Sequence, residues 1–211
     1  YAPIPILELP TDRPRQAKKT FRASRQTIKL ETKLSNDLRR VSGEQDCTLF
    51  MTMLSAYKTL LHRLTGQDDI LIGILTAGRS LAGSQELIGY CTHLLPIRSQ
   101  FVDNLSFLEY LRTLRGVLLN AYEHQDYPFA NLLNHLSEQR KNNHSPLITA
   151  TFNLERSLAV PEMSRLDTSL YSGAIGFADH DLSLNVTEVN TELVLSCDYS
   201  TDLFDTETIG R

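Results

Sequence analysis

The feature that most constrains the fold is a long amphipathic helix pattern followed directly by a continuous apolar run. Between Cys47 and Gly66, apolar residues recur at helical spacing, and the glycine supplies a C-terminal stop. The stripe consists of Phe50, Met53, Leu54, Tyr57, Leu60, Leu61 and Leu64. The next stretch, DDILIGILTAG, is short and rich in β-branched residues, which is typical of a buried strand. A helix joined to a buried strand predicts an α/β layer structure.

The patterns on both sides continue this alternation. A strand is predicted near Gln26–Leu30, and the helical spacing of Leu34, Leu38 and Val41 predicts a helix that ends near Gly43. After the buried strand, the stretch HLLPIRSQF is expected to be extended. The first half of the chain therefore alternates helices with strands.

A second long helix is predicted where Ser106 and Glu109 form a capping box. The apolar face of this helix consists of Phe107, Leu111, Leu114, Leu118 and Tyr122. A shorter helix is expected next, and the residues on its apolar side are Phe129, Leu132, Leu133 and Leu136.

The last third of the chain shows two-residue alternation, which is the period of a strand. From Ile148 to Leu154, apolar residues alternate with polar ones and predict a half-buried strand. A hairpin is predicted between Leu182 and Tyr199, with VNT between its strands. The span Leu158–Phe177 is irregular and is interpreted as a long excursion.

Composition narrows the function classes. The 211 residues contain 21 basic and 25 acidic side chains and no basic block, so a nucleic acid partner is not expected. The three cysteines are far apart and lack CxxC spacing, which favours neither a disulfide framework nor a zinc site and suits a reducing cytoplasm. No apolar run approaches the roughly 20 residues of a membrane span, and no signal pattern opens the chain. A cytoplasmic protein without a membrane anchor is expected.

The N-terminal stretch differs from the rest. Residues 1–16 contain four prolines, which remove amide donors and push neighbouring residues toward extended conformations. Residues 1–24 are therefore interpreted as a linker or extended strap, and residues 25–211 as one folded lobe.

Motifs of common enzymes are absent from the sequence. It contains no GxSxG elbow, P-loop, HExxH or dinucleotide-binding fingerprint. His62 and His135 lie in predicted helices among polar neighbours and are expected at the surface. His180 and Asp181 precede a strand, where an aspartate more often fixes a turn than performs acid–base chemistry.

The stretch AYEHQDYPFANLL could be an active site or the start of a well-capped helix. Asp126 can cap a helix, and Pro128 suits a first helical turn because it lacks an amide donor. His124 and Gln125 end the preceding helix, so the segment is predicted to be a tight corner between two helices.

Several motifs together resemble the C-terminal half of a condensation domain of nonribosomal peptide synthetases. In order, they are TLFMTMLSAYKTLLHRLTGQDDILIGILTAGR, LIGYCTHLLPIRS, YEHQDYPFANLL and HSPLITATFNLE. The resemblance runs from ILELPTDRPR to YSTDLFDTETIGR and so covers essentially the whole chain. It implies a chloramphenicol-acetyltransferase-like lobe, with a mixed β-sheet flanked by helices.

The resemblance also implies a reaction. In such domains two lobes meet along a tunnel, and carrier proteins deliver thioester-linked groups on 4'-phosphopantetheine arms to its two mouths. The acceptor amine attacks the donor thioester and an amide forms. The central histidine of the family belongs to an HHxxxDG motif in the N-terminal lobe, and this chain has no HH pair. The resemblance therefore assigns no catalytic residue, metal ligand or directly bound cofactor here, and it implies that the chain alone is inactive.

The partners implied are the N-terminal lobe of the same domain, upstream and downstream peptidyl carrier proteins, and an adenylation domain downstream. A family pattern resembling IGxFVNTxxxR supplies candidates that line or position the tunnel, namely Gly89, Cys91, Thr92, His93 and Arg98. His93 replaces the usual asparagine. An imidazole can still donate or accept a hydrogen bond, but it also titrates near neutral pH. A functional role and simple packing at a strand start both stay open for His93.

Three further segments carry the resemblance. A GTPxAGR-like segment that forms a floor between lobes gives Gly73, Ala77, Gly78 and Arg79. The HQDxPFE-like corner, expected to be structural, gives His124, Gln125, Asp126, Pro128 and Phe129, with Ala130 in place of glutamate. A degraded RDxSRNPL-like segment, also expected to be structural, gives Arg140 and Pro146.

Other reactions occur in the same superfamily. The alternatives are an epimerization domain, a heterocyclization domain and a carrier-dependent acyltransferase that makes esters. A hypothesis of another class is a non-catalytic lobe that docks carrier proteins.

Overall fold

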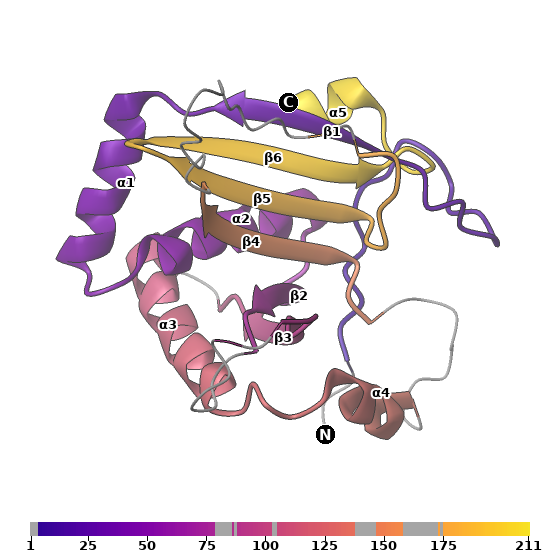
Figure 1. Ribbon diagram of the computed structural model, residues 1–211, viewed down its shortest axis with the longest axis horizontal. Coiled ribbons are helices and arrows are strands. Elements are labelled where there is room, and N and C mark those ends of the chain that lie inside the picture. Colours follow the sequence, from indigo (N-terminus) through magenta and orange to yellow (C-terminus); the bar gives the residue numbers. More distant parts are fainter. Residues whose placement is uncertain are drawn as a thin grey trace. The chain divides into compact units, whose positions relative to one another are not determined.

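The computed structural model describes residues 4–78, 86, 88–102, 105–137, 147–157, 173 and 175–211 (Figure 1). The chain divides into two compact units. Unit 1 comprises Tyr1–Pro10 and Leu38–Phe152, and unit 2 comprises Thr11–Asp37 and Asn153–Arg211. This division does not test the boundary expected at residue 24, which stays a prediction.

Among the described residues, six strands form one sheet in the order β1-β6-β5-β4-β2-β3. The strands are β1 (Ala23–Lys29), β2 (Asp69–Thr76), β3 (His93–Gln100), β4 (Ala150–Arg156), β5 (Leu182–Val189) and β6 (Glu192–Ser200). The helices of the same residues are α1 (Thr32–Glu44), α2 (Leu49–Thr65), α3 (Phe107–Glu123), α4 (Phe129–Ser137) and α5 (Thr206–Gly210). Because β2 pairs antiparallel with β3 and parallel with β4, the sheet is mixed, as predicted.

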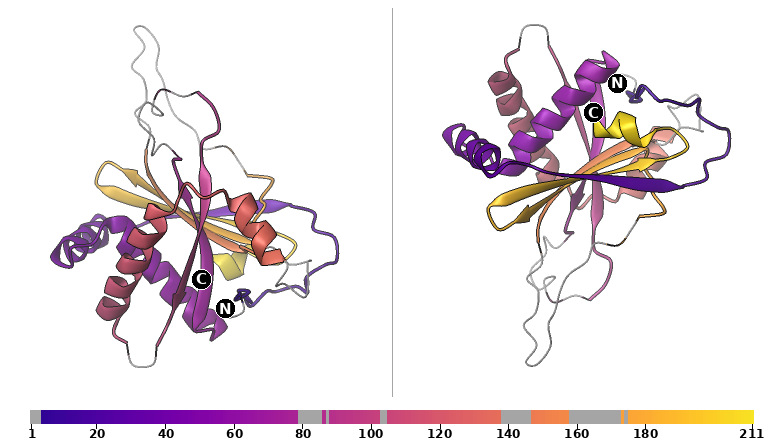
Figure 2. Two further views of the ribbon diagram at one scale, coloured as in Figure 1. Left: turned by 90° about the horizontal axis from the view of Figure 1, so that it is seen from below. Right: turned by 90° about the horizontal axis from the view of Figure 1, so that it is seen from above.

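In unit 1, one face of the β2–β3 hairpin is covered by α2 and α3. Residues at alternate positions of a strand share a face, so Ile70, Ile72 and Ile74 of β2 point the same way, and all three are fully buried. Across the ladder, Ile97 is buried on that face, and Ser99 Oγ lies 2.8 Å from Tyr110 Oη of α3. Figure 2 shows α3 on one side of this hairpin and α4 on the other.

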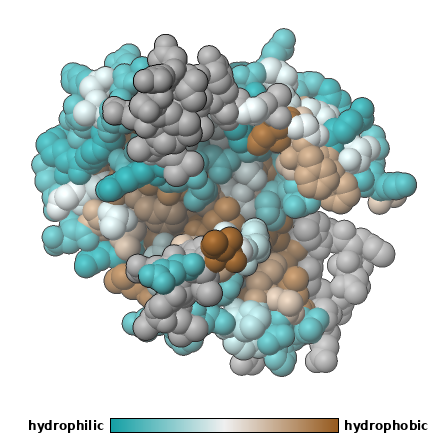
Figure 3. Space-filling model, in the orientation of Figure 1, coloured by the Kyte–Doolittle hydropathy of each residue, from teal (hydrophilic) through white to brown (hydrophobic). Residues whose placement is uncertain are grey.

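The opposite face of the hairpin packs against α4. Leu71 of β2 forms a buried cluster with Leu147 and Ile148. The partly buried side chains that pack on this cluster are Ile4, Leu94, Phe129, Leu133 and Leu136. Figure 3 shows apolar side chains gathered between the hairpin and α4. The predicted apolar side of α4 therefore faces the core of unit 1.

The C-terminal end of α2 is as predicted, but part of its buried face is not. Thr48 accepts a hydrogen bond from the Met51 amide, and Gly66 ends the helix with a left-handed φ of 68°. Leu60 and Leu64, which belong to the predicted stripe, are 52% and 53% exposed.

Polar side chains of α2 occupy the core side in their place. Ser55 and Lys58 are fully buried. The Lys58 ammonium group donates to the carbonyl oxygens of Ile70, at 2.9 Å, and Ile97, at 2.8 Å. These two bonds allow Lys58 to lie on the buried face of α2, where the helical spacing alone predicts an apolar side chain.

Two further burial predictions need correction. In α3 the capping box at Ser106 is present, but Phe107 is 38% exposed and Tyr110 is buried. At the start of β4, Thr149 and Thr151 are buried together with Ala150 and Phe152. The β4 segment is therefore covered on both faces there, and the expectation of a half-buried strand was wrong for that part.

Unit 2 contains the predicted hairpin. The strands β5 and β6 pair antiparallel from Leu182↔Tyr199 to Val189↔Glu192, and Asn190 in the turn has a φ of 55°. The β1 strand pairs antiparallel with the other edge of β6 (Figure 1). The predicted irregular span Leu158–Phe177 lies almost entirely outside the described residues.

The predicted strap is extended from residue 4 to residue 21, a stretch that contains no helix or strand, and β1 begins at Ala23, within the range predicted for the strap. In unit 1, Leu7 is buried and the Glu8 amide donates to Gln67 Oε1 at 2.8 Å. In unit 2, the buried carboxylate of Asp202 accepts hydrogen bonds from the amide and the hydroxyl of Thr20. The strap is therefore held by specific bonds in each unit.

A second buried carboxylate of unit 2 also binds the strap. Asp181 is fully buried and pairs with Arg15 at 2.7 Å and with Lys19 at 3.4 Å. These ion pairs tie Asp181 to the strap, and the turn-fixing role expected from the sequence stays a prediction.

The buried lysine predicts an unusual pH dependence of stability. Burial lowers the pKa of Lys58 from 10.5 to about 7. Between these values the unfolded chain binds more protons than the folded chain, so the free energy of unfolding rises with pH by at most about 1.4 kcal/mol per pH unit. We expect Lys58→Met to remove this rise, measured by urea unfolding from about pH 7 to about pH 9. Equal slopes in both proteins would contradict the prediction.

Because Asp202 binds Thr20 and Arg22, we predict that its removal exposes the strap to proteolysis. We expect Asp202→Ala to speed tryptic cleavage after Arg15, Lys19 and Arg22 by about tenfold, because the bonds to Thr20 and Arg22 are lost. The matched control is Glu207→Ala, which removes an exposed carboxylate from the same unit. If trypsin cleaves the Asp202→Ala variant no faster than the Glu207→Ala variant, Asp202 does not hold the strap.

Candidate functional site

The predicted site residues meet where β2 ends and β3 begins. Thr76 and His93 are the last pair of the β2–β3 ladder. Beyond this pair, Gly78 has a left-handed φ of 57°, and a Cβ at this position would lie 1.7 Å from the Cys91 carbonyl oxygen. The same Cβ position at Gly78 lies 3.2 Å from His93 Nε2. The predicted floor segment, which contains Gly78, and the predicted tunnel segment, which contains Cys91 and His93, are therefore adjacent. Only glycine fits where they touch.

A third predicted segment joins them through one hydrogen bond. His93 Nδ1 lies 3.2 Å from the backbone carbonyl oxygen of Gln125. A carbonyl oxygen only accepts, so Nδ1 carries the proton in this bond and Nε2 of the neutral ring is an acceptor. His93 thus contacts the predicted helix corner on one side and lies beside Gly78 on the other.

The corner between α3 and α4 is built as expected. The His124 amide donates to the Ala121 carbonyl at the end of α3, and its Nδ1 lies 2.9 Å from the Asn120 carbonyl. The Tyr127 amide donates to the His124 carbonyl, and Pro128 precedes α4 directly. The helix-capping role of Asp126 stays a prediction. The Gln125 carbonyl was not foreseen as the partner of His93, because no side-chain pattern marks a backbone acceptor.

Other candidates lie away from this cluster. Arg98 is about 17 Å further along β3 at the usual rise per residue. Its guanidinium group forms a fork with the Asp69 carboxylate, with bonds of 3.0 Å and 2.6 Å. These bonds hold the pKa of Asp69 below and that of Arg98 above the ordinary value. Arg98 therefore ties β3 to the first residue of β2.

The remaining candidates have different surroundings. A Cβ at Gly73 would lie 2.7 Å from Leu94 Cδ1 and 3.0 Å from Ile148 Cγ2, so this glycine allows close packing. Gly89 lies between Ile88 and Tyr90, whose exposed fractions are 103% and 90%. The other candidates that the structure describes are Thr92 beside His93, Ala77 beside Gly78, and Phe129 on the Leu71 cluster. Arg79, Arg140 and Pro146 lie outside the described residues.

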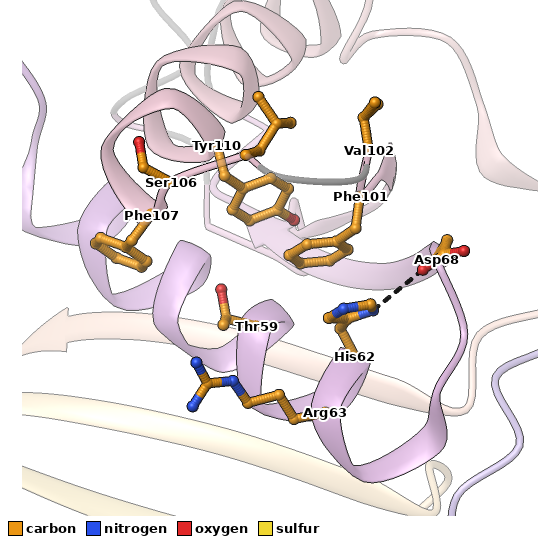
Figure 4. Close-up of a pocket in the computed structure, with 10 residues that line it drawn as sticks. Thr59, His62, Arg63, Asp68, Phe101, Val102, Ser106, Phe107 and Tyr110 are labelled. Carbon is orange, nitrogen blue, oxygen red and sulfur yellow. Dashed lines mark ion pairs between the residues drawn. The ribbon is translucent and has the colours of Figure 1, made fainter.

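A surface pocket of about 280 Å³ lies at the other end of α3 (Figure 4). Three rings stack beside it: His62 on Phe101 at 4.3 Å, and Phe101 on Tyr110 at 4.0 Å between centroids. His62 Nδ1 lies 3.0 Å from the Gln67 carbonyl, and the His62 side chain is 30% exposed where it lines this surface pocket. Phe101, which lies beyond the end of β3, covers its ring.

The thiols and acidic groups offer little further chemistry. The cysteines are free, and burial raises the pKa of Cys197 to about 12, so its thiol stays protonated. Within the described ranges, no group of three or more histidine, cysteine, aspartate or glutamate residues could hold a metal ion. The described helices include none with the length and hydropathy of a membrane span. The His93 cluster is therefore the site that the predicted motifs share.

Comparison with known proteins identifies the family. The family model for the condensation domain matches residues 2–211. Tyrocidine synthase 3 of Brevibacillus parabrevis is 38% identical over 209 residues, which is 99% of this chain and 3% of that protein. Gramicidin S synthase 2 of Brevibacillus brevis is 35% identical over 209 residues, which is 99% of this chain and 5% of that protein. The chain thus spans only a small part of these relatives.

Solved structures agree on the fold. The X-domain from teicoplanin biosynthesis has a TM-score of 0.85 and 21% identity, and the match covers 96% of this chain and 47% of that one. A four-domain nonribosomal peptide synthetase in its holo form, bound to AMP and glycine, has a TM-score of 0.83 and 21% identity, with 97% and 17% coverage. The mixed sheet with its helices has the chloramphenicol-acetyltransferase-like architecture. The chain belongs to the condensation-domain family.

The contact at Gly78 yields a prediction about stability. We expect Gly78→Ala to lower the free energy of unfolding by about 2 kcal/mol, because the new methyl group clashes with the Cys91 carbonyl and φ is positive. The control is Gly116→Ala in α3, where nothing lies within 4 Å of a Cβ and alanine should stabilise by about 0.5–1 kcal/mol. Urea unfolding measures both. A neutral Gly78→Ala variant would show that this contact does not constrain the fold.

Proposed function

We propose that this chain is the C-terminal lobe of a condensation domain that forms an amide bond between two carrier-bound substrates. The observation that carries the proposal is the His93 cluster, in which segments from three family motifs meet through a hydrogen bond and a glycine contact. Coverage supports the lobe assignment. The chain matches 47% of the X-domain chain and 50% of the condensation domain from the Monacolin K polyketide synthase MokA.

Exposed apolar side chains near the cluster also support a missing partner surface. Ile88 and Tyr90, on the approach to β3, expose nearly their whole surface. Large apolar side chains that are adjacent and exposed commonly mark an interface. We assign this surface to contact with the N-terminal lobe of the same domain.

The proposed reaction is an acyl transfer to an amine. A donor acyl or aminoacyl group is held as a thioester on the 4'-phosphopantetheine arm of an upstream carrier protein. The amine of the acceptor aminoacyl group attacks the thioester carbonyl, the carbon–sulfur bond breaks, and the thiol of the donor arm leaves. The amine loses a proton, and the new amide stays on the downstream carrier. The histidine of the HHxxxDG motif would lie in the N-terminal lobe, so this chain alone is inactive in the proposal.

The roles proposed within this chain are therefore positional. Cys91, Thr92 and His93 would border the tunnel, while Ala77 and Gly78 would form its floor. Gly89 would belong to the approach, whereas Arg98 would stabilise the far end of β3 through its fork with Asp69. The partners are the two peptidyl carrier proteins and an adenylation domain downstream, and the compartment is the cytoplasm.

A second candidate function is a non-catalytic lobe that docks other proteins. One similar solved structure is the complex of the X-domain and OxyB from teicoplanin biosynthesis, with a TM-score of 0.84 and 22% identity. That complex is an instance of this fold bound to a separate protein. In this second function the chain would hold a partner without forming amides.

An assay of amide formation distinguishes the condensation function from the docking function. The intact protein that contains this chain, supplied with loaded donor and acceptor carriers, is expected to form the amide, measured as product on the acceptor carrier by mass spectrometry. The isolated 211-residue chain is expected to be slower by at least about a hundredfold, because the general base lies elsewhere. Turnover by the isolated chain would refute the lobe assignment. Carrier binding without turnover by the intact protein would favour the docking function.

A further inference from the structure

His93 stands where the family pattern usually has asparagine, and the structure explains how the two residues can be equivalent. We infer that His93 is a positioning residue whose Nδ1–H group, rather than its charge, ties the α3–α4 corner to the first residue of β3. The inference rests on the condensation function proposed above. Its basis is the bond of 3.2 Å from His93 Nδ1 to the Gln125 carbonyl oxygen.

The equivalence follows from covalent geometry. In histidine, Nδ1 is bonded directly to Cγ, and in asparagine the amide Nδ2 is also bonded directly to Cγ. Both side chains can therefore present an N–H donor at the same number of bonds from the backbone. Aspartate has the shape of asparagine but presents only oxygen acceptors when ionised, and an acceptor cannot bind the Gln125 carbonyl. The inferred requirement at this position is a hydrogen-bond donor.

The bond connects segments that are far apart in the sequence. On one side, Gln125 lies in the corner that determines where α4 begins, and Phe129 of α4 packs on the cluster around Leu71. On the other side, His93 is paired with Thr76, and its Nε2 lies beside Gly78. A shift of the imidazole would therefore move the ends of both strands relative to the corner.

This link matters for the proposed reaction because the strand ends border the tunnel. A misplacement of about 1 Å in groups that position a substrate can lower a rate by a hundredfold. His93 needs no proton transfer to have such an effect. Loss of the donor should lower kcat while the fold of unit 1 persists.

The test uses the intact protein and three substitutions. His93→Asn keeps the donor, His93→Asp removes it at nearly constant shape, and His93→Gln moves it by one methylene group. Amide formation with loaded carriers is measured across pH, and hydrogen exchange followed by mass spectrometry reports on the corner. We expect His93→Asn to keep kcat within about twofold with an unchanged pH profile, whereas His93→Asp loses about tenfold to a hundredfold in kcat.

Hydrogen exchange tests the link without any catalysis. In His93→Asp and His93→Gln, peptides that contain Gln125 and Tyr127 should exchange about tenfold faster, while peptides from the β5–β6 hairpin stay as in the wild type. The β5–β6 peptides show that unit 2 has folded, and peptides from α2, which should also exchange as in the wild type, show that unit 1 has folded. If the wild-type protein forms no amide, the proposed function fails, but this comparison still decides whether the link exists.

Each other outcome overturns the inference. If His93→Asn loses turnover as fully as His93→Asp, the imidazole itself is required and the donor is not sufficient. If His93→Asp matches His93→Asn in both kcat and exchange, no donor is needed. If the pH profile changes in His93→Asn while exchange at the corner does not, His93 acts through its titration.

Discussion

Unit 1 depends on the two hydrogen bonds of the Lys58 ammonium group. They run from α2 to the Ile70 carbonyl of β2 and the Ile97 carbonyl of β3, so one side chain joins a helix to both strands of the hairpin. A buried amino group is tolerated only where such acceptors are present, so α2 can pack in this position but not in one rotated about its axis. With α2 in this orientation, α2 and α3 cover one face of the β2–β3 hairpin, and α4 packs against the other face.

The candidate site is a consequence of these layers. Because α3 lies on one face of the hairpin and α4 on the other, the chain must turn at the edge where β3 begins, and the corner with Gln125 forms that turn. His93 is the first residue of β3 and meets the corner there. Gly78 completes the contact, since a side chain at this position would overlap the Cys91 carbonyl. Motifs that are dozens of residues apart thus converge at one edge.

The sequence predicted those features whose causes are local. Helix ends at Gly66 and Ser106, and the alternation of the β5–β6 hairpin, are encoded within a few residues, and the structure confirms them. Features set by distant partners could not be predicted. Leu60 fits the apolar spacing of α2 yet is exposed, because the bonds of Lys58 orient the helix. The Asp69 partner of Arg98 depends on strand register, and the acceptor for His93 is a backbone carbonyl, which any residue type supplies.

A match of lengths explains why His93 and Gln125 meet. At one end of α3, Tyr110 contacts Ser99 of β3, and at the other end Gln125 contacts His93. The thirteen helical steps from Tyr110 to Glu123 cover about 20 Å, and the six strand steps from His93 to Ser99 also cover about 20 Å, so α3 returns along β3 to its first residue. One residue inserted into α3 would turn the corner by about 100° around the helix axis and carry the Gln125 carbonyl away from the imidazole. The length of α3 is therefore as much a part of the candidate site as His93 itself.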